Sequence, residues 1–251
     1  MVCGMSARIT LAIAIALPGL AHAEHVDVEQ PNTVELAAQS AFTPTIASAD
    51  ATGRGIAVAS TTYNAATKAT TLDVAAALRL AGSLRLVLRV DNVTDQGRPG
   101  VGAAYQWLSE RKHGVSSTAY LVYKAEGLSE PEGEIEALVS FGRNLGPVRG
   151  VVNVAYGQDA DAKERDGEVA LHVSTALSSR VIAGVVGRYR DALGSGGDHG
   201  VIRDAFGGLS MTVVAGPIGI TGMAGIAGVE TTASGALTSG PAATIAVGTG
   251  F

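Results

Sequence analysis

The stretch "TLDVAAALRLAGSLRLVLRVD" (residues 71–91) contains two runs in which apolar and polar positions alternate. In residues 71–80 the large apolar side chains fall on the even positions, and in residues 84–91 both arginines and the aspartate fall on the odd positions. A period of two places each set on its own side of an extended chain, whereas a helix would spread the arginines around its surface. The short segment "LAGS" (80–83) between the runs fits a tight turn. The stretch therefore predicts two antiparallel strands, each with one apolar and one polar face.

The same alternation recurs along the chain after Arg54. The further runs lie at about 55–63, 101–110, 115–124, 134–143, 149–157, 168–177, 180–189, 206–215, 218–228 and 241–251. Together these runs predict about twelve strands, each close to the roughly 9–11 residues that cross a bilayer at a tilt. Strands of soluble sandwiches are usually nearer about five or six residues. The count falls to about ten if residues 54–63 belong to the segment that precedes them.

The connections between these runs show a second regularity. Tight ones ("LAGS", "ERKHG", "NLGPV", "LSSR" and "AGPI") alternate with longer polar ones such as "NVTDQGRPG" and "QDADAKERDG". Short turns at one rim and long loops at the other are typical of an up-and-down barrel threaded through a membrane. We therefore expect residues 54–251 to form an all-β, transmembrane, up-and-down antiparallel β-barrel. A soluble secreted β-sandwich is the alternative, and it gives no reason for alternating loop lengths.

The first 23 residues have the pattern of a secretory signal peptide. Arg8 precedes a short apolar run at residues 9–17, and residues 21–23 form an A-x-A cleavage site. Cleavage after Ala23 also removes Cys3, the only cysteine of the chain. An uncleaved anchor helix is the alternative, for which the apolar run is short.

Residues 24–53 are rich in Ala, Thr, Ser and Pro and are weakly patterned. We expect a periplasmic N-terminal extension rather than a folded domain. Its acidic residues are Glu24, Asp27, Glu29, Glu35 and Asp50. This acidic character leads to the hypothesis that the extension docks as a plug on arginines at the periplasmic mouth of the barrel.

Composition excludes several classes of protein. Hydrophobic residues make up 47% of the 251 residues and charged residues 16%, which is too apolar for a disordered chain. After the first two dozen residues no apolar run approaches the ~20 residues of a spanning helix. A net charge of −5 argues against nucleic acid as a partner. Asp198 and His199 could bind a metal, but two ligands are too few to indicate a metal site, and we expect neither a metal nor a cofactor.

The final run, "PAATIAVGTGF" (241–251), stops on an aromatic residue without a polar tail. Ile245, Val247, Thr249 and Phe251 share one side of this run. In this respect the chain resembles Gram-negative outer-membrane β-barrel proteins of the porin kind, without a match to a specific family. The resemblance implies that these four residues form the signal read by the barrel-assembly machinery. It also implies a place in the cell outer membrane, in contact with lipid and lipopolysaccharide.

Barrels of this class carry girdles of aromatic residues at both membrane interfaces. Aromatic residues make up only 4% of this chain. We therefore expect a thin girdle, built from Tyr105, Trp107, Tyr123, Phe141, Tyr156, Tyr189 and Phe206.

If the apolar face of each strand meets lipid, the polar face lines the interior. The expected pore-lining residues are Asp73, Arg79, Arg85, Arg89, Asp91, Glu134, Glu136, Arg149, Glu168, His172, Arg180 and Arg188. Several arginines lie beside short turns and most carboxylates lie toward long loops, which predicts an interior that is basic at one end and acidic at the other. Two interpretations stay open. The charges select small charged solutes by their field, or they neutralise one another in a narrow lumen.

These observations predict a porin-like channel for the passive diffusion of small polar or charged solutes. The alternative is a closed outer-membrane barrel with a structural, adhesive or surface-binding role through its long loops. We do not expect an enzyme. His172 alternates with Ser174 on one face, but no third member of a catalytic group can be identified.

Overall fold

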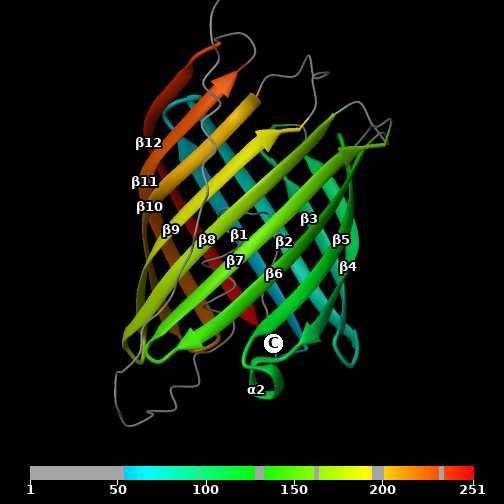
Figure 1. Cartoon of the computed structure of the whole chain (residues 1–251), viewed down its shortest axis with the longest axis vertical. Helices are drawn as coiled ribbons and strands as arrows, with labels where there is room; N and C mark the ends of the chain where they lie inside the picture. The colour runs from blue at the N-terminus through cyan, green and yellow to red at the C-terminus, as the bar shows by residue number, and fades with distance from the viewer. Residues whose placement is uncertain (1–53, 96, 128–132, 161–163, 194–200, 232–234) are drawn as a thin grey trace, which may run out of the picture.

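The computed structural model describes residues 54–95, 97–127, 133–160, 164–193, 201–231 and 235–251. The expected signal peptide (1–23) and N-terminal extension (24–53) lie outside these residues. Within them, strands form one closed antiparallel barrel (Figure 1). The strands are β1 (Gly55–Asn64), β2 (Ala69–Ala81), β3 (Leu84–Asp91), β4 (Arg98–Leu108), β5 (Ser116–Ala125), β6 (Gly133–Leu145), β7 (Val148–Asp159), β8 (Arg165–Ser178), β9 (Val181–Ala192), β10 (Val201–Ala215), β11 (Ile218–Thr231) and β12 (Leu237–Gly250). No helix in the described part of the chain is long and apolar enough to cross a membrane.

The first and last strands close the barrel. β1 pairs with β12 on one side and with β2 on the other, and every other strand pairs with its neighbours in sequence. The amide nitrogens of Arg54 and Gly55 donate to the carbonyl oxygen of Phe251 at 2.7 and 2.9 Å, and the Phe251 nitrogen donates to the Gly55 oxygen at 3.0 Å. Among the twelve described strands no edge is left unpaired. The predicted twelve-stranded up-and-down barrel is confirmed, and the ten-strand and sandwich alternatives are wrong.

The two rims differ in their connections, as expected. Turns of two residues join β2 to β3, β6 to β7, β8 to β9 and β10 to β11 at one rim, which we call the short-turn end. The connection from β4 to β5 at this end holds a single helical turn, α2 (Glu110–His113), which stops at Gly114 with φ of 71°. In Figure 1 this end, with α2, lies at the bottom of the view. We call the opposite rim the long-loop end.

Burial alternates along each strand, because a closed barrel has one side facing inward and one facing outward. The outward side is apolar: Leu121 is 58% exposed, and its neighbour Val122 on the inward side is 1% exposed. On the described strands, the charged residues with outward positions all lie within three residues of a strand end. They are Arg143, Arg165, Asp191, Arg203 and Glu230. An apolar band between two charged rims is the surface that a lipid bilayer covers.

Exposed aromatic residues border this band on both sides. Those in the halves of their strands next to the long loops are Tyr63, Tyr123, Tyr156 and Tyr189. Those next to the short turns are Tyr105, Trp107, Phe141 and Phe251. Phe206, which we expected among them, faces inward instead. It belongs to the inward row of β10 and its ring covers the Cα of Gly208, so the side chain is 5% exposed.

Candidate functional site: the interior of the barrel

The inward side near the long-loop end carries many charges, which we call the charged tier. It draws on seven strands (β2, β3, β5, β6, β8, β9 and β10), each of which contributes one or two charged inward residues. Its seven carboxylates are Asp73, Asp91, Glu134, Glu136, Asp166, Glu168 and Asp204. Its four cations are Arg89, Lys124, Arg188 and Arg190. Arg98 and Asp159, of opposite charge, lie at strand ends beside the tier.

Arg89 of β3 organises the first part of the tier. Its Nη2 donates to Asp91 Oδ2 at 2.7 Å and to Glu136 Oε2 at 3.1 Å, and its Nη1 donates to Glu136 Oε1 at 2.8 Å. The side chain of Arg89 is completely buried. A guanidinium bound at two points to one carboxylate is held in a fixed orientation. Arg89 therefore links β3 to β6, with two strands between them.

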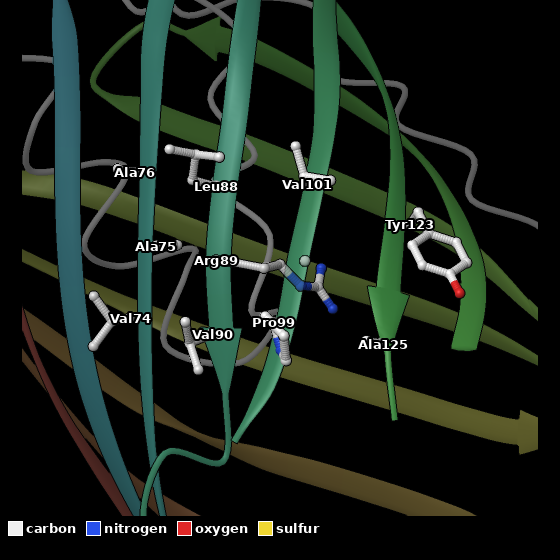
Figure 2. A pocket seen from close by; sticks show the side chains of 11 residues that line it. Val74, Ala75, Ala76, Leu88, Arg89, Val90, Pro99, Val101, Tyr123 and Ala125 are labelled. Atoms are coloured by element: carbon white, nitrogen blue, oxygen red, sulfur yellow. The ribbon is translucent and has the colours of Figure 1, made fainter. Parts of the chain in front are cut away.

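The Arg89 side chain can extend from β3 to Glu136 on β6 because β4 leaves space for it. Figure 2 shows the Arg89 side chain extending from β3 across β4. At the crossing point β4 carries Gly100, on which a Cβ atom would lie only 2.9 Å from Arg89 Cγ. Real Cβ atoms are essentially never that close to another heavy atom. The absence of a side chain at Gly100 thus sets the path of Arg89.

Lys124 of β5 extends the same cluster. Its Nζ lies 2.6 Å from Glu134 Oε2 and 3.8 Å from Glu136 Oε2, so Glu136 is shared between Lys124 and Arg89. The Glu134 carboxylate lies over Gly157 of β7, where a Cβ atom would overlap with its Oε1. A second glycine therefore makes space for a charged side chain of a neighbouring strand.

Two further ion pairs lie across β8, β9 and β10. Arg188 binds Asp204, and Arg190 binds Asp166. Arg188 and Asp204 are each 19% exposed in their side chains, whereas Arg190 is 46% exposed. The pairing stabilises charges in a partly dry environment, where an isolated charge would be costly.

Glu168 lies between these two groups and joins neither. It makes no hydrogen bond or ion pair with the described residues, and its Oε1 is buried without a partner. Its cross-strand neighbour on β9 is Arg190, but that guanidinium binds Asp166. Buried oxygens of Asp91 and Asp204 (Oδ1 in each) also lack a hydrogen-bond partner in the described structure. The tier therefore holds carboxylate oxygens that its own cations do not satisfy.

Below the tier, at mid-height, the inward side chains are uncharged. We call this level the neutral belt, and its buried members are Val58, Val87, Tyr120, Leu138, Ser140, Asn153, His172, Val186, Ser210, Thr221, Met223 and Ala246. His172 Nε2 lies 2.9 Å from Ser210 Oγ, and Thr212 Oγ1 lies 2.8 Å from Thr221 Oγ1. The partner of His172 is thus on β10, two strands away, and not Ser174 on its own strand.

The short-turn end carries arginines on the inward side. Arg85 and Arg149 are buried, and Arg79 is exposed near the rim. Arg149 Nη1 donates to Glu110 Oε2 at 3.2 Å. Glu110 belongs to α2 and also accepts from the backbone nitrogen of Asn144 at 2.6 Å, so the helical turn is fastened to the rim.

A shallow apolar groove of about 570 Å³ lies on the other side of the wall (Figure 2). It is bordered by outward side chains of β2 to β5, among them Val74, Leu88, Val101 and Tyr123. These residues belong to the apolar band, so the groove is part of the outer surface and not of the interior. No group of three or more His, Cys, Asp or Glu side chains in the described ranges is arranged to hold a metal ion.

Most of the expected pore-lining residues occupy inward positions. The exception is Arg180, which lies exposed in the two-residue turn between β8 and β9. The arginines Arg89 and Arg188, which the sequence did not assign to an end, lie at the long-loop end and pair with carboxylates there. The sequence reasoning missed Lys124, Asp166, Arg190 and Asp204. The last three lie just beyond the predicted strand ends, because the strands extend past their apolar alternation.

No protein-family model matches the chain, and no curated protein is similar to it in sequence. Solved structures do match it in fold. The NanC porin superposes with a TM-score of 0.56 at 8% identity, over 78% of this chain and 100% of that chain. The KdgM porin, solved in complex with disordered oligogalacturonate, superposes with a TM-score of 0.52 at 9% identity, over 78% and 99%. The expected resemblance is confirmed at the level of the fold, which is that of outer-membrane β-barrel porins.

Proposed function

We propose that this protein is an outer-membrane channel through which small polar or charged solutes diffuse passively. The observation that carries the proposal is the charged tier inside an apolar band. Eleven ionisable side chains on an inward wall are costly in a dry interior, even when most are paired. A lumen that contains water accommodates them, as the polar interiors of porins do. The porins similar in fold support the class of function, and we take no solute from them.

The same proposal places the chain in the outer membrane, in contact with lipid and lipopolysaccharide. The outward apolar band with its two groups of aromatic residues supports this. The long loops would then face outward and the short turns, with α2, the periplasm. Ile245, Val247 and Thr249 of β12, with Phe251 directly after it, would be the part that the barrel-assembly machinery binds, because they form the outward row at the end of the chain.

Planar-bilayer recording of the purified protein tests the channel directly. We expect stepwise increases of current after addition of the folded barrel. A preparation heated until it migrates as the unfolded form on a gel is the matched control and should give no steps. Folded barrel that inserts and never conducts would contradict the proposal.

A second candidate function is a closed barrel that acts through its long loops in adhesion or envelope structure. The neutral belt favours it, because Val87 is 0% exposed and Leu138 is 1% exposed. Little solvent therefore reaches the wall at this height. The two functions differ in a liposome-swelling assay: small sugars and salts enter through a channel and remain outside a closed barrel.

A further inference from the structure

The charged tier has more carboxylates than cations. Seven carboxylates against four cations leave an excess of three negative charges on one level of the inward wall. Excess charge of one sign on the wall of a narrow passage attracts ions of the opposite sign and repels ions of the same sign. Salt screens this effect over roughly 8–10 Å at physiological concentrations.

The ion pairs distribute this excess unevenly. Arg89 and Lys124 engage Asp91, Glu134 and Glu136, and the two arginines of β9 engage Asp166 and Asp204. Among the carboxylates of the tier, Glu168 makes neither a hydrogen bond nor an ion pair with a described residue. Asp73 also has no ion pair with a described residue, but it accepts a hydrogen bond from the backbone nitrogen of Asn92 at 2.8 Å. Glu168 is therefore the carboxylate of the tier with the fewest direct contacts to a donor or cation.

The charges around Glu168 act in both directions. Arg188 and Arg190 exert the larger electrostatic effects on its carboxylate, and Glu136 and Asp204 act against them. The Oε1 atom of Glu168 is buried and has no donor to bind. A buried acceptor without a donor is an exception in folded proteins and points to a missing partner. A permeating cation or an ammonium group is a partner of the right charge for this position.

We propose that Glu168 makes the barrel selective for cations, with small inorganic cations and solutes bearing an ammonium group as the favoured class. This inference rests on the proposed channel function. The buried arginines at the short-turn end act in the opposite sense but lie beyond the neutral belt. A preference for cations would therefore mean that the charged tier outweighs these arginines, and a preference for anions would mean the reverse.

The test is the reversal potential of the channel in a planar bilayer with a KCl gradient. We expect wild-type protein to favour K⁺ over Cl⁻, and Glu168→Gln to lower the permeability ratio of K⁺ to Cl⁻ roughly threefold. Glu168→Asp should retain most of the selectivity, because the charge stays on the same wall. Glu230→Gln is the matched control, since Glu230 is a carboxylate of the same rim at an outward position, paired with Arg203.

The outcomes separate the two proposals. Absence of current from folded wild-type protein contradicts the channel function. Current that favours Cl⁻, or a ratio that Glu168→Gln leaves unchanged, overturns the inference about Glu168 while the channel stands. An equal change in Glu168→Gln and Glu230→Gln also overturns it, because the effect would then come from the charge of the rim as a whole.

Discussion

Arg89 on β3 and Glu136 on β6 form two hydrogen bonds, of 2.8 and 3.1 Å, although two strands lie between them. The link braces the inward wall across four strands. It depends on a completely buried guanidinium that also binds Asp91. Removal of one partner from a buried ion pair leaves an uncompensated charge, which costs much more than the loss of an exposed pair.

We therefore expect Arg89→Met to lower the free energy of unfolding by about 3–5 kcal/mol. Unfolding by urea in detergent can be followed by fluorescence, because Trp107 is the only tryptophan and packs edge-on against Phe141. The control is Arg203→Met, whose side chain is 52% exposed and whose pairs should contribute less than about 1 kcal/mol. Equal losses in the two variants would show that burial does not govern the strength of these links.

The glycines of the inward wall offer a second test, on β7. Gly157→Ala places a methyl group where the Glu134 carboxylate lies, and we expect a loss of about 1–3 kcal/mol from the forced displacement. Gly150 on the same strand has no atom within 4 Å of an added Cβ, so Gly150→Ala should be neutral or stabilise by up to about 1 kcal/mol. The same urea titration measures both. A Gly157→Ala protein as stable as Gly150→Ala would contradict the packing described here.

Phe251 contributes to the barrel in two separable ways. Its backbone bonds Arg54 and Gly55, and its side chain lies outward at the short-turn rim. Phe251→Ala keeps the backbone bonds, so refolding into detergent should match the wild type, while the amount of barrel assembled in cells falls. Deletion of Phe251 should reduce both. Normal assembly of Phe251→Ala in cells would argue against a role of the ring as an assembly signal.

The pair formed by His172 and Ser210 should not act as a nucleophile and base. No described carboxylate hydrogen-bonds to His172, so nothing orients its ring as the third member of a catalytic triad does. We expect no covalent labelling of the folded protein by a fluorophosphonate probe. Labelling that disappears in Ser210→Ala would instead indicate hydrolase chemistry inside the barrel.

The sequence predicted the fold well because alternation with a period of two is a local property. Each residue of a strand in a closed barrel faces either inward or outward, and its polarity indicates which side it faces. The sequence placed the ends of β8, β9 and β10 too far inside the strands. Asp166, Arg190 and Asp204 lie beyond the apolar alternation, yet remain in strands because ion pairs with neighbouring strands compensate their charges.

The partners within the site could not be predicted. Arg89 binds Glu136 because Gly100 leaves room on the strand between them, and His172 binds Ser210 on another strand instead of Ser174. Such contacts depend on the register of several strands at once. Phe206 shows the same limit: its aromatic character predicted a membrane interface, whereas its place in the inward row of β10 was decided by strand register.

The backbone bonds between Gly55 and Phe251 have a consequence for the connectivity of the chain. The two ends of the barrel meet at one rim as neighbouring strands, with the hydrogen bonding of any other pair. A short linker from Phe251 to Gly55 would complete the ring covalently, and the chain could then be opened at any long loop. The barrel should thus tolerate circular permutation, with any strand that follows a long loop as a starting point.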